Sequence, residues 1–270
     1  MVTLRIKIFC LICDHITSQI KMIPTALLLG DSQTQLGWGE AGWVTLVAEK
    51  FVRRLDLVNR GLSGYNTRML LAVLPDILAA EPLSRVTAVT LMMGSNDASF
   101  PDTNPEQAVP LEEFGENLLK IVSLLLNHGI KKEAILLVSP PPILPDKWAQ
   151  HRRSCPGPEY RNCKDNQLTA QYAAETGRVA ARLGLGWLDL FSAMMKLTNL
   201  EAALSDGLHL AREGHAVLYQ LLCPELERRL GPGPGDPVVR FPEWRELGNQ
   251  SGDQCAAGYS KWKLDNPGRV

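Results

Sequence analysis

Thr25-Ala-Leu-Leu-Leu-Gly30-Asp31-Ser32-Gln33-Thr34 decides the fold class that the sequence predicts. The apolar run has the length of a strand and ends abruptly at turn residues, which is typical of a buried parallel strand leading into a loop. In open α/β sheets, ligands bind just beyond the carboxyl ends of such strands. Ser32 is therefore expected at the edge of a sheet, beside backbone N–H groups and a helix that starts at about Gly39. An ordinary β-to-α turn has the same composition, so this stretch alone does not identify a nucleophile.

The rest of the chain alternates between segments with strand and helix patterns. Four further strands are expected at 55–59, 86–93, 134–139 and 186–190. Apolar residues at helical spacing predict helices at 39–55, 67–78, 111–127, 166–183, 191–197 and 212–230. An irregular insertion is expected at 143–161. This alternation predicts an α/β fold, with a parallel sheet covered by helices on both faces.

Three segments are expected in the chain. Residues 1–22 are predicted to be an N-terminal extension, because their apolar run is too short for a signal sequence and no small-residue cleavage site follows. Residues 23–230 are predicted to form one α/β domain. Residues 231–270 form a tail that begins with a Gly-Pro repeat, a composition compatible either with packing on the domain or with mobility.

Charge and cysteine content limit the partners that are expected. The formal net charge of −1 gives no electrostatic reason to expect a nucleic acid. No run approaches the roughly 18 apolar residues of a membrane-spanning helix. The six cysteines favour free thiols in a cytoplasmic enzyme, with Cys155 and Cys163 in one loop as the only pair worth attention. Cys10-x-x-Cys13 lacks a second pair at zinc spacing, and neither a metal nor a cofactor is expected. The oligomeric state is not indicated.

Several loops contain the residue types that acyl transfer through a serine requires. A histidine suits the role of base near neutral pH, and Asp206, three residues before His209, is close enough to orient it. The N–H groups of Ser32 and Gly64 and the amide of Asn96 are candidate donors to the oxyanion. A turn glycine, a helix cap at Asn96 and a plain loop aspartate explain each residue equally well on its own. Their joint occurrence at the carboxyl ends of successive elements favours a serine hydrolase.

The remaining histidines are weaker candidates. His215 falls in the first turns of the closing helix, where a surface or core position is expected, and His128 precedes a helix-ending glycine. His151 lies in the insertion and is a possible substrate contact, whereas His15 lies in the extension. Ser32 is not within a Gly-x-Ser-x-Gly elbow, which argues against the α/β-hydrolase class, and phosphate-loop and dinucleotide-binding motifs are absent.

Four blocks resemble those of the SGNH, or GDSL-type, hydrolases, and they occur in the order typical of that family: Gly30-Asp31-Ser32, Ser63-Gly64, Gly94-Ser95-Asn96-Asp97 and Asp206-Gly207-Leu208-His209. The resemblance covers about residues 25–230. It implies a flavodoxin-like three-layer α/β/α sandwich with a five-stranded parallel sheet. It also implies Ser32 as nucleophile, His209 as base, Asp206 as its partner, and Gly64 and Asn96 as oxyanion donors.

The same resemblance implies a small-molecule, short-chain acyl ester as substrate. Gln33 stands where the family often has Ile or Leu, which leaves the lining of the acyl pocket open. A carbohydrate deacetylase, a thioesterase and a lysophospholipase remain open within the family. A non-catalytic scaffold that keeps the fold is the alternative outside enzymes, and the presence of all five site residues argues against it.

Overall fold

The computed structural model describes residues 23–155, 161–230, 241–242, 244–247 and 251–265. The predicted N-terminal extension, residues 1–22, lies outside the described residues. The chain divides into two compact units. Of the described residues, one unit contains 25–50, 57–155 and 161–230, and the other contains 23–24, 51–56 and those after 240.

The larger unit is built on a five-stranded parallel sheet with strand order β2-β1-β3-β4-β5. The strands are β1 (Thr25–Gly30), β2 (Asp56–Gly61), β3 (Val86–Met92), β4 (Ile135–Val138) and β5 (Gly186–Leu188). The order reverses at β1 and β3, which is the place where ligands bind in doubly wound sheets. The predicted parallel sheet is therefore confirmed, and its site-forming edge is defined.

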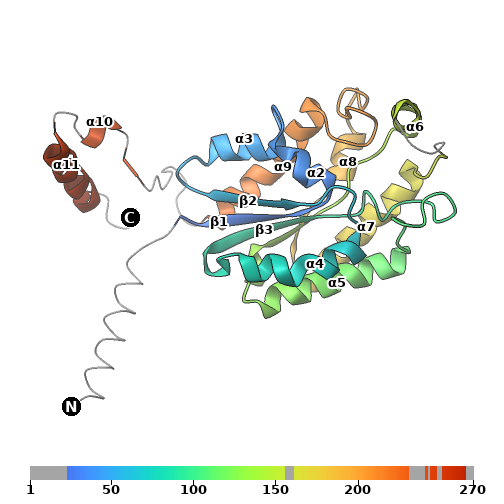
Figure 1. Ribbon diagram of the computed structural model, residues 1–270, viewed down its shortest axis with the longest axis horizontal. Helices are drawn as coiled ribbons and strands as arrows, with labels where there is room; N and C mark the ends of the chain where they lie inside the picture. The colour runs from blue at the N-terminus through green and yellow to red at the C-terminus, as the bar shows by residue number, and fades with distance from the viewer. Residues whose placement is uncertain (1–22, 156–160, 231–240, 243, 248–250, 266–270) are drawn as a thin grey trace, which may run out of the picture. The chain divides into compact units, whose positions relative to one another are not determined.

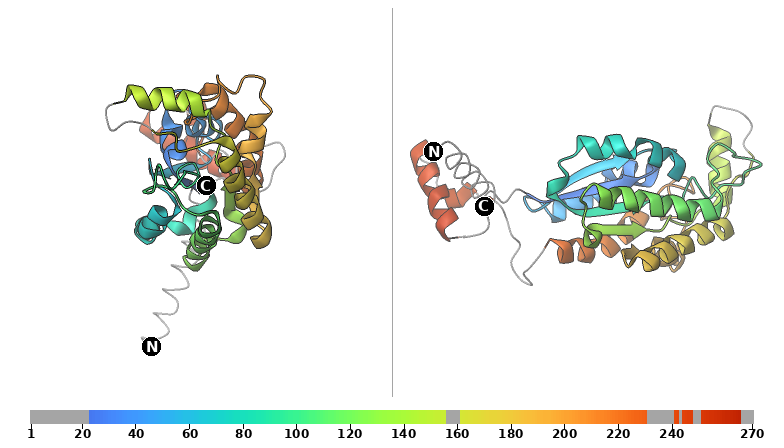
Figure 2. Two further views of the ribbon diagram at one scale, coloured as in Figure 1. Left: turned by 90° about the vertical axis from the view of Figure 1, so that its right-hand side faces the viewer. Right: turned by 90° about the horizontal axis from the view of Figure 1, so that it is seen from below.

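Helices cover both faces of this sheet, as Figures 1 and 2 show. One layer contains α3 (Trp43–Lys50), α8 (Leu190–Met195) and α9 (Arg212–Arg229). The other contains α4 (Thr67–Ala80), α5 (Leu111–Asn127) and α7 (Asn166–Leu183). The predicted three-layer α/β/α sandwich is confirmed.

The alternation of side chains along the central strands explains why two helix layers are needed. Leu27 and Leu29 of β1 belong to the core beneath α4, α5 and α7, whereas Leu28 between them is equally buried but lies outside that cluster. Successive strand residues point to opposite faces, so a continuous apolar strand requires cover on both. Each fully buried leucine contributes roughly 1.5–3 kcal/mol, which holds the strand ends, and hence the site, in place.

Capping residues determine where the best predicted helices begin and end. α7 starts after Asp165, whose carboxylate accepts the Leu168 N–H at 2.6 Å, and ends at Gly184 with φ of 62°. Both features are common helix signals. The predicted ranges 166–183 and 111–127 agree with α7 and α5.

The sequence-based ranges are wrong in two places near the site. The helix expected from Gly39 to Leu55 is shorter, because α3 ends at Lys50, and it is preceded by α2 (Ser32–Gln35) and a 3₁₀ turn (Leu36–Trp38) that were not expected. α2 begins directly at the strand end because the Asp31 carboxylate accepts the Gln33 N–H at 2.9 Å. The insertion expected to be irregular contains α6 (Pro145–Ser154), which starts with a proline at its first position.

Cysteines, the C-terminal tail and the apolar segments were also considered in the sequence. No disulfide joins Cys155 to Cys163 in the described part of the chain. The tail contains α10 (Trp244–Leu247) and α11 (Gly252–Asp265), where the rings of Tyr259 and Trp262 stack with centroids 6.2 Å apart. Within the described ranges, no helix has both the length and the apolar character needed to cross a membrane.

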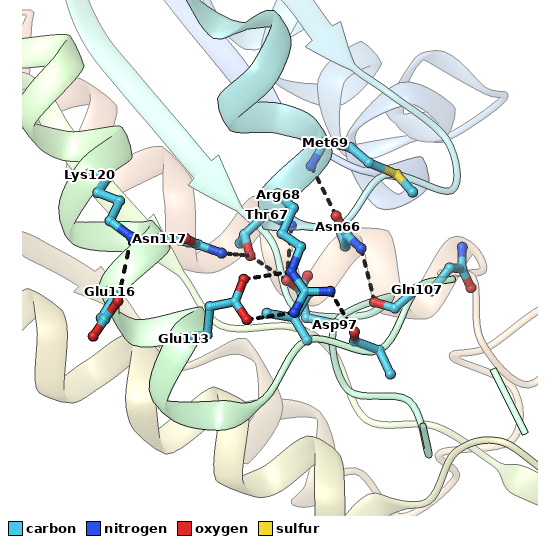
Figure 3. A network of polar contacts seen from close by, with 12 residues as sticks. Asn66, Thr67, Arg68, Met69, Asp97, Gln107, Glu113, Glu116, Asn117 and Lys120 are labelled. Carbon is cyan, nitrogen blue, oxygen red and sulfur yellow. Dashed lines mark hydrogen bonds and ion pairs between the residues drawn. The ribbon is translucent and has the colours of Figure 1, made fainter. Parts of the chain in front are cut away.

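A buried polar network ties the loop after β3 to α4 and α5 (Figure 3). Asp97 Oδ1 accepts the Thr67 N–H at 2.9 Å and the Thr67 hydroxyl at 2.5 Å. Asn117 of α5 donates to the same hydroxyl at 3.1 Å. Asp97 thus accepts the first N–H of α4 from a distant loop, while Asn66 caps the same helix by accepting the Met69 N–H at 3.0 Å. The network fixes the loop that carries Asn96.

Burial raises the pKa of Asp97 to about 6, against the hydrogen bonds from Thr67 and the charge of Lys164, which act to lower it. In the unfolded chain this carboxyl has its ordinary pKa of 3.8. Between these two values the folded chain binds more protons than the unfolded chain. Asp97 therefore makes the folded state lose stability as the pH rises from about 4 to about 6.

The substitution Asp97→Asn should remove this contribution, because the amide does not titrate and its Oδ1 still accepts from both Thr67 donors. We expect the wild type to lose about 1–2 kcal/mol more than the variant when urea unfolding is measured at about pH 4.5 and about pH 6.5. The same pH dependence in both proteins would contradict the assignment. Asp102→Asn, at an exposed position, is the matched control.

Candidate active site

Ser32 is the first residue of α2 and directly follows the end of β1. Gly30 pairs with Met92 of β3, so the loops after β1 and β3 start at the same level of the sheet. Gly30 also has to be a glycine, because a Cβ there would overlap the Thr34 side chain and lie 2.7 Å from the Met92 carbonyl oxygen. The sharp turn places Ser32 at the carboxyl edge, as the sequence predicted.

His209 and Asp206 lie on the loop before α9, called the base loop below after the role that the sequence predicts for His209, and they complete a line of hydrogen-bonded side chains with Ser32. His209 Nε2 is 2.9 Å from Ser32 Oγ, and His209 Nδ1 is 2.7 Å from Asp206 Oδ2. The other carboxylate oxygen of Asp206 accepts the backbone N–H groups of Leu208 at 2.9 Å and His209 at 2.8 Å. In this geometry a proton can pass from a serine hydroxyl to an imidazole that a carboxylate orients.

The ionisation of Asp206 suits this arrangement. Burial acts to raise its pKa, but the hydrogen bonds from the His209 side chain and from the backbone N–H groups of His209 and Leu208 outweigh burial. The pKa of Asp206 is therefore held well below its usual range. The carboxylate stays charged near neutral pH, and one of its oxygens faces the His209 imidazole.

Gly64 and Asn96 lie on the wall of the same cavity as Ser32. Gly64 has φ of +83°, a conformation that favours glycine, and its N–H donates to no acceptor among the described residues. Asn96 Nδ2 donates to the Tyr65 carbonyl at 2.9 Å. A side-chain amide has two N–H donors, so one is left for a ligand.

Gln107 links these two groups and was not identified from the sequence. Its Nε2 donates to the Gly64 carbonyl at 2.8 Å and lies 3.3 Å from Asn96 Oδ1. The residue is in the segment 100–110, which has no regular pattern. Its function depends on a turn 43 residues away, so no local signal reveals it.

Gln33 has a role different from the one considered at the sequence level. Its side chain is buried and bridges the base loop, donating to the Leu208 carbonyl at 2.8 Å and accepting the Leu210 N–H at 3.1 Å. Gln33 does not line the cavity described around Ser32. The polar residue after Ser32 thus holds His209 through the residues on either side of it in the sequence.

Lys164 is a second residue that the sequence did not reveal. Its ammonium is buried and donates to the carbonyls of Ser95 and Asn96 and, at 2.7 Å, to Ser99 Oγ. Burial lowers the pKa of Lys164 to about 8, whereas Asp97 and Asp31 nearby act to raise it. Burial likewise raises the pKa of Asp31 to about 6. The charged side chain therefore fixes the backbone on either side of the Asn96 amide.

α6 forms the wall of the cavity beside His209. The cavity measures about 530 Å³, and its lining includes Ser32, Asn96, Trp148, Arg152, Lys164 and His209. The Trp148 ring meets the His209 ring edge-on, with centroids 6.0 Å apart. A Cβ on Gly207 would lie 2.5 Å from the Trp148 nitrogen, so the base loop and α6 approach closely. The insertion contributes to the cavity, which the sequence left open.

The other described histidines do not contact Ser32. His215 is a buried core residue, and this burial lowers its pKa to about 4. His128 follows α5, and its Nδ1 is 2.8 Å from the Leu124 carbonyl. His151 stacks on Trp148 and has its Nε2 3.9 Å from Asp206 Oδ2. Among the described residues, no cluster of three or more His, Cys, Asp or Glu side chains is arranged to hold a metal ion.

Comparison with known proteins identifies the family. The model of the GDSL-like lipase/acylhydrolase family matches residues 28–217. The chain is 35% identical over 242 residues to the isoamyl acetate-hydrolyzing esterase 1 homolog of Mus musculus, covering 87% of this chain and 93% of the mouse protein. The chain belongs to the GDSL-like lipase/acylhydrolase family. The resemblance seen in the four sequence blocks is thus confirmed, and the activity class of this GDSL hydrolase is that of a carboxylic ester hydrolase.

Relatives in plants and bacteria agree with this assignment. A GDSL esterase/lipase of Arabidopsis thaliana is 35% identical over 225 residues, covering 80% of this chain and 90% of the plant protein. The lipase/acylhydrolase of Enterococcus faecalis superposes with a TM-score of 0.59 at 25% identity, covering 78% of this chain and all of the other. The acetyl-xylooligosaccharide esterase Axe2, with a TM-score of 0.55 at 22% identity, shares the fold.

The Gln33 bridge predicts a strong effect of Gln33→Leu on turnover. The change leaves a buried carbonyl and a buried N–H of the base loop without partners, which costs about 1–3 kcal/mol in stability. It also loosens His209, and we expect kcat for a neutral acetate ester to fall by about tenfold or more, with a smaller change in KM. Gln171→Leu, at an exposed position of α7, is the control for a leucine introduced on the surface. Unchanged kcat in Gln33→Leu would contradict this role.

The Lys164 contacts predict a second effect on turnover. Lys164→Met removes the donors to the Asn96 loop and leaves two buried carboxylates without their cation, so both the melting temperature and kcat should fall. We expect a loss of at least about tenfold in kcat, since the loss of an oxyanion donor itself costs about 10²–10³. Lys131→Met, at an exposed position, is the matched control. A folded Lys164→Met with wild-type kcat would refute the interpretation.

Proposed function

We propose that the protein is a serine esterase that hydrolyses small, short-chain carboxylic esters through an acyl-enzyme. The observation that carries the proposal is the hydrogen-bonded line from Ser32 Oγ through His209 to Asp206, with distances of 2.9 Å and 2.7 Å. Ser32 begins α2, whereas His209 lies 177 positions later on the loop before α9. Such a line is hard to explain by local turn formation alone.

In the proposed reaction, Ser32 Oγ attacks the ester carbonyl carbon while its proton moves to His209 Nε2. The N–H groups of Ser32 and Gly64 and the free N–H of Asn96 stabilise the oxyanion of the tetrahedral intermediate. His209 then gives the proton to the leaving alcohol oxygen, and the acyl group stays on Ser32. A water molecule, deprotonated by His209, attacks the acyl-enzyme, and the collapse of the second intermediate releases the acid and restores the serine.

The cavity supports a small substrate. Its volume is about 530 Å³, and most of its lining residues are of polar types, with Trp148 and Leu208 as the large apolar side chains. Two large apolar side chains are enough to contact a short acyl group such as acetyl, and this supports a short acyl chain over a long one. The isoamyl acetate-hydrolyzing esterase 1 homologs among the relatives are compatible with an acetate-type ester. The polar lining also fits an acetyl group on a carbohydrate, and a series of alcohols with a constant acetyl group separates these substrates.

Labelling with a fluorophosphonate tests the nucleophile. We expect rapid labelling of the wild type, none of Ser32→Ala, and strongly reduced labelling of His209→Ala. Turnover of 4-nitrophenyl acetate should fall by about 10⁴-fold or more in both variants, because the residues of such a triad act as a unit. Ser123→Ala, at an exposed serine of α5, is the control. A folded wild type that neither labels nor hydrolyses any short ester would favour a non-catalytic scaffold.

A further inference from the structure

The charges around the cavity are unevenly distributed. Three basic side chains, Arg152, Arg161 and Lys164, line the cavity. Among the described residues, Glu106 is the only acidic side chain in the lining. The chain as a whole carries a net charge of −1, so this local excess of positive charge is a property of the cavity and not of the protein.

Contacts within the protein satisfy the charge of Lys164, whereas the two arginines have no such ionic partner among the described residues. The Lys164 ammonium is buried among carbonyl groups near Asp31 and Asp97. No carboxylate of the described residues lies within ion-pair distance of Arg152 or Arg161, although most other arginines of the larger unit, such as Arg68 and Arg229, have such a partner. Two guanidinium groups are therefore available to a ligand at the cavity wall.

The position of Arg152 relative to the base indicates which part of a substrate it would meet. Its guanidinium carbon lies 5.7 Å from the centre of the Trp148 ring, which in turn meets the His209 ring edge-on. Stacking on an aromatic ring orients the planar guanidinium while leaving its N–H donors available. In the proposed reaction His209 protonates the leaving alcohol, so the alcohol part of the ester lies on the side of His209 and of the α6 wall.

We propose that the preferred substrate carries an anionic group, a carboxylate or a phosphate, on the alcohol part of the ester, and that Arg152 and Arg161 bind this group. This inference rests on the proposed esterase function and narrows its substrate class. Guanidinium groups form paired hydrogen bonds with the oxygens of both anions. Glu106, the acidic residue of the lining, precedes Gln107, whose side chain donates to the Gly64 carbonyl. The acidic side chain therefore belongs to the loop next to Gly64 and not to α6, where Arg152 lies.

Matched pairs of esters test the proposal. 4-Acetoxybenzoate and 4-acetoxybenzamide release the same acetate and differ in the charge of the alcohol part. 4-Nitrophenyl adipate monoester and 4-nitrophenyl hexanoate differ in the charge of the acyl part. For each pair, the ratio of kcat/KM for the anionic ester to that for the neutral ester is measured in the wild type, Arg152→Gln, Arg161→Gln and the double variant. Comparing ratios between proteins cancels the intrinsic reactivity of the esters.

We expect the alcohol-side ratio to fall about fivefold in each single variant and about tenfold or more in the double variant, in the range of charge pairs that remain partly solvated. Arg152→Lys should retain more of the ratio than Arg152→Gln. Arg182→Gln, at an exposed position of α7 outside this cavity, is the matched control and should keep the wild-type ratio. Thermal melting of each variant shows whether it is folded.

A wild-type experiment gives a second test that needs no variant. Raising the ionic strength from about 0.05 M to about 0.5 M should lower kcat/KM for 4-acetoxybenzoate more than for 4-acetoxybenzamide, because salt screens exposed charges. An alcohol-side ratio that is unchanged in the double variant and insensitive to salt overturns the proposal, and a change confined to the acyl-side pair overturns the placement of the anion. Failure to hydrolyse the neutral esters as well would refute the esterase function itself.

Discussion

The pairing of β1 with β3 is the constraint on which the site depends. Gly30 lies opposite Met92, so the loops that carry Ser32 and Asn96 leave the sheet at the same level. The Leu62 N–H donates to the Gly30 carbonyl at 2.9 Å, which brings the glycine-containing turn to the same edge. A shift of one residue would move these loops by about 3.3 Å and turn every side chain of β1 to the opposite helix layer. The apolar cover on both faces excludes that shift.

A layer of buried charged side chains below the site also fixes the positions of these loops. Asp31, Asp97 and Lys164 come from three different loops and are all buried. Removing charges from water is costly unless each has partners, so an arrangement of this kind is stable only when the three loops are correctly placed. The layer thus penalises misplacement of the loops, whereas the apolar core below it is more tolerant of small movements.

The sequence predicted the framework better than the supports of the site. The alternation of apolar segments was sufficient to predict the sheet and both helix layers. The four short blocks were sufficient to predict the loops that bring Ser32, Asp206 and His209 together. The bridging role of Gln33 and the position of Lys164 were not predicted, because their partners are backbone groups of segments 175 and 69 residues away, which no local pattern encodes. α6 was missed because its residues are mostly polar and only its proline start is typical of a helix.

The separation of the serine and its base along the chain has a consequence for biosynthesis. Ser32 and His209 are 177 positions apart, and α9, which follows the base loop, packs on α3, which follows the serine. A ribosome therefore completes the sheet before the base loop has emerged. Under the proposed mechanism, the nascent chain carries a serine without its base throughout most of its synthesis, and hydrolysis requires the docking of α9, the last helix of the larger unit.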